Sequence, residues 1–181
     1  MAAKTYQLKI TLLGSKPPIW RRLLVPSDMT LLELHEALQV AMGWQNCHMH
    51  SFRIGRAEYP PSDEFMGEID KSPELRAVLK KVGSKAIYTY DFGDGWGHLI
   101  TVEKILATAP DVLHPICLGG KLRCPPEDCG GLYGYYNLLE ALSDPKHPEH
   151  RELKRWLGKG CDPQHFSVDE VNAELAAMYR R

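Results

Sequence analysis

An α+β fold in a single domain is the class that this sequence predicts, with a mixed, mostly antiparallel sheet of about five strands and packed helices. Alternating apolar and polar residues, typical of half-buried strands, dominate residues 5–106. Apolar residues at the spacing of a helix face dominate residues 133–181. A chain of 181 residues has the length of one ordinary domain and can bury a core without disulfides or structural metal, so we expect one domain over residues 1–181.

Charge and composition argue against several classes of function. Acidic and basic residues nearly cancel, with a formal net charge of −1, and they are mixed along the chain. This balance does not support direct nucleic-acid binding, because neutralisation of phosphates supplies most non-specific affinity. The start of the chain lacks a signal-peptide core and no run is apolar enough to span a bilayer, so we expect a cytoplasmic protein without a membrane partner. Five irregularly spaced cysteines indicate reduced thiols.

The first two strands and the first helix are predicted by periodicity and by turn signals. Residues 6–12 alternate apolar and polar positions, a Gly-Ser-Lys-Pro-Pro segment reverses the chain, and residues 19–25 form the second strand. A helix is expected from Thr30 to about Met42. Thr30 and Glu33 can form a capping box at its start, and its apolar positions recur at helical spacing.

The middle of the chain predicts a strand, a long connection, a short helix and a hairpin. The strand covers residues 48–54, and the polar, acidic residues 56–71 read as a surface connection that could form a rim or lid. Ser72 is expected to cap the short helix, with a proline at the first helical position. Residues 86–92 and 100–106 are expected to pair as the two strands of the hairpin.

The last third of the chain predicts a loop followed by three helices. Residues 117–131 are so rich in glycine and proline that we expect irregular structure there. Helices are expected at about residues 133–142, 148–157 and 168–179, and the last has its own capping box. We expect these helices to cover the sheet of the same domain.

Residues 88–98, YTYDFGDGWGH, form the most unusual stretch of the sequence. Three glycines in one short turn are typical of left-handed backbone or of close approach by another segment. Plain hairpin turns are small and polar, so an indole and an imidazole beside this turn indicate a built feature. If the turn and the cysteine-containing loop lie at one end of the sheet, a candidate cleft is lined by Asp91, Asp94, Trp96, His98, Glu127, Asp128 and Cys129.

Two histidines are the candidate metal ligands. On a strand over residues 48–54, His48 and His50 lie on one face, because alternate side chains point the same way. Such a pair can bind one metal ion, or it can be two hydrogen-bonded histidines beneath an aromatic lid, and the sequence leaves both alternatives open. The metal would be a divalent transition ion, zinc or manganese, since imidazoles and carboxylates suit these ions.

Other polar residues have both a structural and a functional interpretation. Arg21 and Arg22 lie in the middle of a strand, so at least one guanidinium projects from the polar face, either solvated or ion-paired, or as an anion-binding site. His35 lies beside the apolar stripe of its helix and is interpreted as a hydrogen-bonded residue at the edge of the core. Cys129 precedes two glycines and a helix, which fits a reactive thiolate or a thiol packed in a rigid loop.

Several motifs in one order resemble a known family over nearly the whole chain. They are Pro17-Pro18-Ile19-Trp20-Arg21-Arg22, Leu34-His35 through Ala41-Met42-Gly43-Trp44, His48 with His50, Tyr90-Asp91-Phe92-Gly93-Asp94 with Trp96 and His98, and Cys124 to Gly131. This combination resembles the plasmid pRiA4b ORF-3-like family, also met as a passenger protein of bacterial insertion elements under a resolvase-like name. The resemblance implies an α+β fold with a mixed or antiparallel sheet and packed helices.

The resemblance implies no reaction, because the activity of the family is not established. Serine recombination, which the resolvase-like name suggests, needs an activated serine supported by arginines and a DNA-binding helical module, and the sequence shows no such arrangement. We therefore interpret the chain as a non-catalytic accessory binding or interaction module of a plasmid or mobile element, with a protein or peptide partner. The alternative is a metal-dependent hydrolase or nuclease that uses a cluster of the histidines and acids named above.

Overall fold

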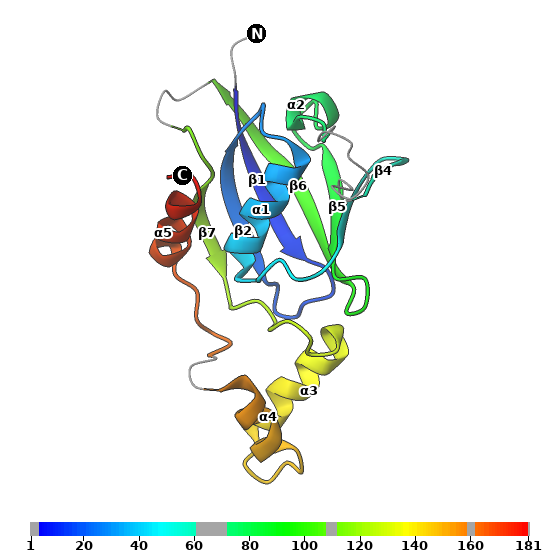
Figure 1. Cartoon of the computed structure of the whole chain (residues 1–181), viewed down its shortest axis with the longest axis vertical. Helices are drawn as coiled ribbons and strands as arrows, with labels where there is room; N and C mark the ends of the chain where they lie inside the picture. Colours follow the sequence, from blue (N-terminus) through cyan, green and yellow to red (C-terminus); the bar gives the residue numbers. More distant parts are fainter. Residues whose placement is uncertain (1–3, 61–71, 108–111, 159–161, 181) are drawn as a thin grey trace.

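The computed structural model describes residues 4–60, 72–107, 112–158 and 162–180. Seven strands and five helices lie within these residues (Figure 1). The strands are β1 (Lys4–Leu12), β2 (Trp20–Pro26), β3 (His50–Ile54), β4 (Ala57–Tyr59), β5 (Lys85–Tyr90), β6 (Trp96–Ala107) and β7 (Ile116–Lys121). The helices are α1 (Leu31–Met42), α2 (Leu75–Val78), α3 (Gly131–Ser143), α4 (His150–Leu157) and α5 (Val168–Met178). Each described helix is too short or too polar to cross a membrane.

All seven strands belong to one sheet with the order β4-β3-β5-β6-β1-β2-β7, and every pairing in it is antiparallel. The predicted hairpins β1–β2 and β5–β6 are present, and β1 pairs with β6 to join them. The α+β fold is therefore confirmed. The prediction of about five strands is wrong, because the sheet has seven.

The two missed strands, β4 and β7, lack the alternation that identified the others. β4 is three residues long and mostly exposed, so it has no apolar face to read. β7 contains Gly119 and Gly120 within the segment expected to be irregular. Gly120 is nonetheless suited to its place, because an added Cβ would lie 2.6 Å from the Phe166 ring and 2.8 Å from the Trp20 carbonyl oxygen. The glycine is there to let other groups approach the strand closely.

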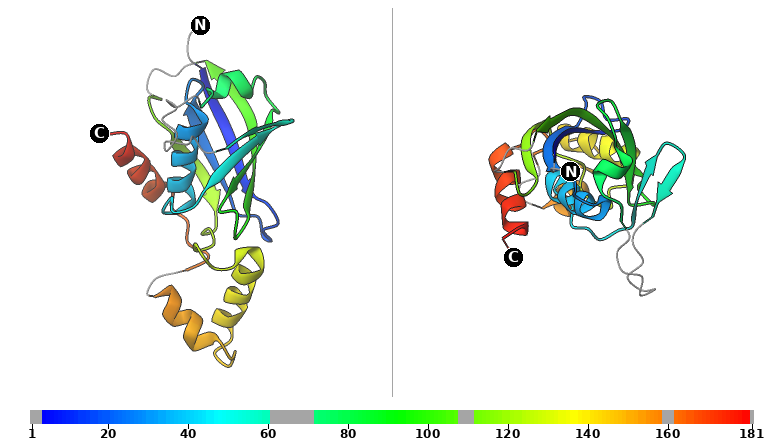
Figure 2. Two further views of the ribbon diagram at one scale, coloured as in Figure 1. Left: turned by 45° about the vertical axis from the view of Figure 1, so that its right-hand side comes forward. Right: turned by 90° about the horizontal axis from the view of Figure 1, so that it is seen from above.

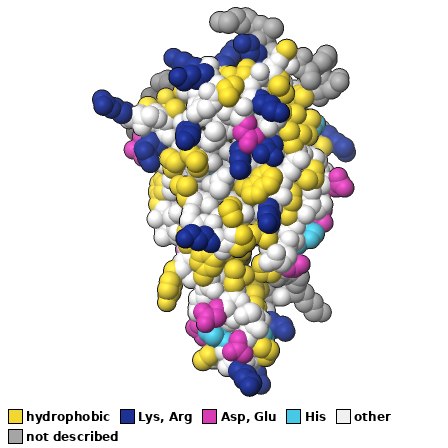
Figure 3. All heavy atoms as spheres, turned by 180° about the vertical axis from the view of Figure 1, so that it is seen from behind, with side chains coloured by type: hydrophobic (Ala, Val, Ile, Leu, Met, Phe, Trp, Pro, Cys, Tyr) yellow, Lys and Arg dark blue, Asp and Glu magenta, His cyan; other side chains and the backbone are white. Residues whose placement is uncertain are grey.

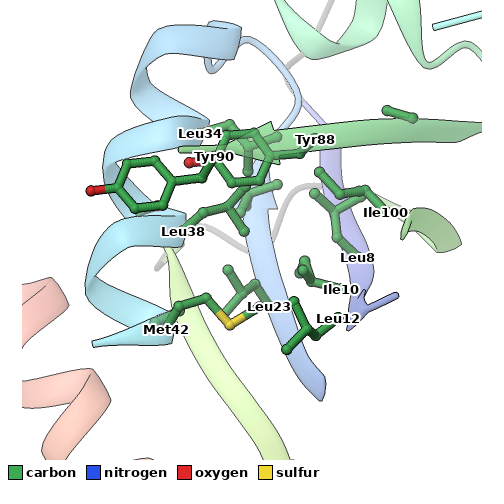
Figure 4. Close-up of a cluster of buried hydrophobic side chains, with 14 of the residues drawn as sticks. Leu8, Ile10, Leu12, Leu23, Leu34, Leu38, Met42, Tyr88, Tyr90 and Ile100 are labelled. Carbon is green, nitrogen blue, oxygen red and sulfur yellow. The ribbon is translucent and has the colours of Figure 1, made fainter. Parts of the chain in front are cut away.

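Helix α1 packs across one face of the sheet and encloses the core (Figures 1 and 4). Its start is the predicted capping box: the Glu33 amide donates to the Thr30 hydroxyl at 3.2 Å, and the Thr30 amide donates to the Glu33 carboxylate at 2.7 Å. Gly43 ends the helix at φ 81°. The core between helix and sheet includes fully buried side chains from both, among them Leu8, Ile10, Leu12, Leu23, Leu34, Leu38 and Ile100.

The opposite face of the sheet is covered by none of the described helices. Basic and apolar side chains predominate over the sheet on the side shown in Figure 3. Arg22 pairs there with Glu103 through hydrogen bonds of 2.6 and 2.9 Å. Lys9 and Arg22 also lie over the Trp20 ring, at 5.6 and 5.1 Å from its centroid. The half-buried Trp20 ring thus lies against cations from two strands.

The C-terminal helices do not all cover the sheet, contrary to the prediction. Helix α5 packs beside β7 and α1. Helices α3 and α4 pack against each other and project beyond one end of the sheet (Figure 2). The apolar side of α3 still reaches the main core through Leu132, Tyr135, Tyr136 and Leu139, whereas α4 has no buried residue. The projecting pair adds a wall beyond the sheet at the end where the β5–β6 turn lies.

Two local predictions near residue 72 need correction. Helix α2 begins at Leu75, and Glu74 precedes it without a side-chain cap. The Ser72 hydroxyl instead accepts a hydrogen bond of 3.0 Å from the Leu32 amide, so it serves the first turn of α1. The predicted connection over residues 56–71 contains β4, and its part from residue 61 onward lies outside the described residues. A capping signal in sequence does not say which nearby helix the hydroxyl will reach.

Candidate functional site at the end of the sheet

Three segments meet at the end of the sheet nearest α3: residues 45–49, the β5–β6 turn and residues 124–131. The Asp91 amide donates to the Met49 carbonyl at 2.9 Å, which joins the first segment to the turn. The Tyr90 hydroxyl accepts from the Cys47 amide at 3.0 Å and donates to Glu127 Oε1 at 2.5 Å, which joins all three. The Gln45 amide also donates to Glu127 Oε1, at 3.2 Å.

The β5–β6 turn contacts the loop before α3 and the first residue of α3 through both side chain and backbone. Asp94 Oδ2 accepts a hydrogen bond of 3.2 Å from the Gly130 amide. A Cβ at Gly131 would lie 2.6 Å from the Asp94 carbonyl oxygen, and Gly131 itself has φ 65°. Only glycine combines this left-handed backbone with so close an approach. The sequence singled out both glycine-rich segments, and the structure places them in contact.

One imidazole and two carboxylates gather at this junction. His48 Nε2 lies 3.2 Å from Asp128 Oδ1 and 3.8 Å from Asp91 Oδ2. One donor atom from each of these three residues lies within 4.8 Å of the other two. His48 precedes β3 rather than lying within it, so it turns away from the strand pattern that predicted its pairing with His50. Chain regions some 40 residues apart thus supply one cluster.

The two carboxylates of this group are held differently. Asp91 is only 7% exposed, and its Oδ1 accepts hydrogen bonds from the Gly93 and Asp94 amides at 2.9 and 3.3 Å. These bonds fix the side chain and leave Oδ2 on the side of His48. The side chain of Asp128 is 72% exposed, and its backbone, like that of Asp91, is left-handed, with φ values of 56° and 54°. Aspartate is one of the few residues that tolerate this conformation.

An open cleft of about 350 Å³ lies next to this cluster. Its walls come from the end of α1, the loop before α3 and the end of α4. Trp156 on the α4 side is 49% exposed. The residues that line the cleft are Gly43, Gln45, Cys47, Pro126, Glu127, Asp128, Trp156 and Leu157.

A model of one protein family matches residues 4–170 of the chain, and its description is plasmid pRiA4b ORF-3-like protein. The chain belongs to the plasmid pRiA4b ORF-3-like family. The resemblance found in the sequence motifs is therefore confirmed.

Two relatives show how completely this pRiA4b ORF-3-like chain matches other proteins. Uncharacterized protein y4hQ of Sinorhizobium fredii strain NGR234 is 41% identical over 193 residues, covering 100% of this chain and 99% of the relative. The crystal structure of protein of unknown function MM3350 from Methanosarcina mazei Go1 superposes with a TM-score of 0.81 at 35% identity. That match covers 94% of this chain and 98% of the other.

The second histidine of the predicted metal pair, His50, has a different neighbour in this family member. Its ring stacks on His35 at a centroid distance of 3.5 Å and an interplanar angle of 7°. Burial, followed by the neighbouring His35, lowers the pKa of His50 to about 4. His50 is absent from the donor group of His48, Asp91 and Asp128. The sequence placed the two imidazoles together, whereas the structure directs them to different partners.

His35 is hydrogen-bonded, as the sequence indicated, but it is buried within the core at 1% exposure rather than half-buried at its edge. The Gln39 side-chain amide donates to the Tyr88 hydroxyl at 2.9 Å, and Gln39 Oε1 accepts from the Asn46 amide, which fixes its orientation. The Tyr88 proton is then directed to His35 Nδ1 at 2.7 Å, and His35 Nε2 donates to Asn46 Oδ1 at 2.7 Å. Burial lowers the pKa of His35, in keeping with this neutral imidazole.

Trp96 and His98, both candidates for the cleft, are instead core residues, with exposures of 1% and 0%. The His98 ring lies 5.3 Å from Trp44 in edge geometry and 5.4 Å from Tyr88. Neither of its ring nitrogens makes a well-aligned hydrogen bond to a described residue. Complete burial lowers the pKa of His98 to about 4.

Arg21 and Arg22 both have structural partners. Arg21 is 3% exposed and donates to the carbonyl oxygens of Ala41, Trp20 and Lys121. Its guanidinium also lies 4.3 Å from the centroid of the Phe166 ring. The guanidinium of Arg22 donates hydrogen bonds to the Glu103 carboxylate. These bonds are the main reason why the pKa of Glu103 falls to about 2. An anion would have to displace these groups, and anion binding stays a prediction.

Cys129 is half-buried, with its sulfur 3.9 Å from the Gly131 carbonyl oxygen. The cleft includes a different thiol, the exposed Cys47. Sequence analysis did not select Cys47, Gln45 or Trp156 as site residues. The one available signal was Trp156 itself, a large apolar side chain among charged neighbours on a short helix.

Proposed function

We propose that this protein is a non-catalytic binding module whose cleft receives a basic side chain of a peptide or protein partner. The observation that carries the proposal is the composition of the cleft: two adjacent carboxylates on one wall and a half-exposed indole on the other. A Lys or Arg side chain suits both walls, because its charge pairs with a carboxylate and its cationic head or apolar stem packs on the indole. The plasmid in the family name supports an accessory role on mobile elements.

Glu127 is the acid best prepared for this role. Its Oε1 is occupied by the Tyr90 hydroxyl and the Gln45 amide, which fixes the carboxylate without neutralising it. Glu127 Oε2 makes no hydrogen bond within the described part of the chain. Burial, with the hydrogen bond to Glu127 as the next cause, raises the pKa of Tyr90, so the hydroxyl stays protonated and keeps donating. A fixed carboxylate pairs with a cation at a lower entropic cost than a mobile one.

Selection from a displayed library of random heptapeptides tests this function. We expect enriched peptides to carry Lys or Arg beside an apolar residue. The Kd of a selected peptide, measured by calorimetry, is expected to rise at least tenfold in Glu127→Gln and in Trp156→Ala. Gln can still accept the Tyr90 hydrogen bond, so the first change removes mainly charge.

Glu140→Gln is the matched control, because Glu140 is exposed on α3. The control should bind the selected peptide as the wild type does. Enrichment without basic residues would count against the proposal. So would affinities that change less than threefold in both cleft variants.

A metal-dependent hydrolase or nuclease is the second candidate, favoured by the grouping of His48, Asp91 and Asp128. A metal ion with three protein ligands retains a position for water and lowers its pKa, which is the requirement for hydrolysis. This candidate predicts cleavage of bis(p-nitrophenyl) phosphate or p-nitrophenyl acetate with added Mn²⁺ or Zn²⁺, and loss of at least 90% of the rate in Asp91→Asn. Rates equal in wild type and variant would reject it.

A further inference from the structure

His48 and the two aspartates beside it are not explained by a peptide-binding cleft. Of the three, only Asp128 is among the residues that line the cleft, and His48 and Asp91 are not. We propose that His48 Nε2, Asp91 Oδ2 and Asp128 Oδ1 bind a divalent transition-metal ion, Zn²⁺ or Mn²⁺. The inference stands on the geometry of these side chains and does not depend on peptide binding.

The spacing of the donor atoms is close to that of a coordination sphere. Metal–ligand bonds of about 2.0–2.2 Å place neighbouring donors about 3.0–3.5 Å apart in octahedral or tetrahedral geometry. The observed separations from His48 Nε2 are 3.2 Å to Asp128 and 3.8 Å to Asp91, and no pair exceeds 4.8 Å. The side chain of Asp128 is 72% exposed, so it can rotate toward an ion that lies between His48 and Asp91.

Within the described residues, the donor atoms of His48 and Asp91 are directed at each other. His48 Nε2 is buried and makes no well-aligned hydrogen bond to a described residue, although two carboxylate oxygens lie near it. Asp91 is 7% exposed, and its Oδ1 accepts the hydrogen bonds from the Gly93 and Asp94 amides. Its other carboxylate oxygen, Oδ2, faces His48. A buried imidazole nitrogen without a hydrogen bond is costly, and a bound cation would satisfy it while pairing with the Asp91 carboxylate.

The charge and type of the donors select the ion. Two carboxylates and a neutral imidazole match the charge of a divalent cation. One imidazole favours a transition ion over Ca²⁺ or Mg²⁺, which take oxygen donors, and no thiolate belongs to the group of described donors. Zn²⁺ and Mn²⁺ both accept mixed nitrogen and oxygen ligands.

The segments that carry the three donors are held together by contacts that do not involve a metal. The Asp91–Met49 bond holds Asp91 next to the segment of His48. The contacts of Asp94 with Gly130 and Gly131 hold the loop that carries Asp128. Preorganised ligands lose little conformational entropy on binding, so the fold supports affinity before any ion arrives.

Calorimetry with ZnCl2 and MnCl2 on untagged, chelator-treated full chain at pH 7.5 tests the site. We expect one equivalent to bind to the wild type. His48→Ala, Asp91→Asn and Asp128→Asn are each expected to raise the Kd at least tenfold. Asparagine tolerates left-handed backbone as aspartate does, so the two Asn variants remove charge without new strain. In the wild type, Mn²⁺ should also broaden the NMR signals of the His48 ring before those of other histidines.

Two controls separate this site from its alternatives. Asp94→Asn keeps the acceptor for Gly130 and lies in the same turn but outside the donor group, so its metal affinity should stay within threefold of wild type. His50→Gln should also stay within threefold, because His50 stacks on His35. Absence of saturable binding, broadening centred on another histidine, or a loss in His50→Gln equal to that in His48→Ala would overturn the proposal. Glu127→Gln and Trp156→Ala should retain metal binding, so failure of peptide binding leaves this result unaffected.

Discussion

Acidification from pH 7 to pH 5 is expected to lower the free energy of unfolding by about 4 kcal/mol. The cause is the burial of His50 and His98, which lowers the pKa of each imidazole from its usual 6.5 to about 4. Between pH 6.5 and pH 4 the imidazoles are protonated in the unfolded chain but neutral in the folded chain. The free energy of unfolding therefore falls as the pH falls. The pKa of His35 is lowered as well and adds to the loss in the same direction.

The expected slope is about 2.4 kcal/mol per pH unit near pH 5.5, since each of the two groups contributes about 1.2 kcal/mol. Above about pH 8 these histidines contribute almost no slope, because the imidazoles are neutral in both states. The loss is a large fraction of the free energy of unfolding of a typical domain, which is about 5–15 kcal/mol. Urea unfolding followed by circular dichroism at pH 5, 6 and 7 measures it.

His50→Gln is expected to reduce the slope by about one proton, even if the variant is less stable at pH 7. NMR titration of the wild-type imidazoles gives a second measurement that needs no variant. A titration midpoint near 6.5 for both His50 and His98 would contradict the explanation. So would equal stability at pH 5 and pH 7.

Arg21→Ala is expected to cost about 3–5 kcal/mol of stability, whereas Arg22→Ala should cost about 1 kcal/mol or less. Removal of the Arg21 guanidinium deprives buried carbonyl groups of donors, including Ala41 at the end of α1, and leaves a gap beneath Phe166. Arg22 makes one ion pair on the uncovered face of the sheet, where the pair is about one-third exposed on the arginine side.

Arg21→Lys provides a finer test of the same contacts. Lysine keeps the charge but cannot donate in several directions from a planar fork, so we expect about 2–3 kcal/mol of destabilisation. Guanidinium chloride unfolding at pH 7 compares the three variants with the wild type. Equal losses for Arg21→Ala and Arg22→Ala would show that the buried hydrogen bonds do not carry the difference.

The neighbouring arginines show where sequence information ends. They have the same chemistry and adjacent positions, and alternation says that they point to opposite faces of β2. Alternation does not predict which face of the sheet the helices cover. It also does not predict that a guanidinium would be buried on that face. The carbonyl groups that accept hydrogen bonds from the Arg21 guanidinium belong to β2, β7 and α1. Only the folded arrangement brings these three elements together.

The candidate site also has a part that the sequence predicted and a part that it did not. The sequence identified the glycine-rich turn, the acids at residues 127 and 128, and His48, because residue types and glycine density are local properties. It paired His48 with His50 because a strand was expected to begin two residues too early. Trp156 was missed because its helix was expected to lie on the sheet, away from any cleft.

The sequence by itself determined the α+β class, the two hairpins, the capping box of α1 and membership of the family. Each of these depends on local periodicity, on turn chemistry or on motifs in a fixed order. Tertiary structure alone decided which polar groups meet: His48 with Asp91 and Asp128, His50 with His35, and Arg21 with buried carbonyl groups. The physical reason is that sheet order and loop contacts set these distances, and neither is encoded in the spacing of the residues along the chain.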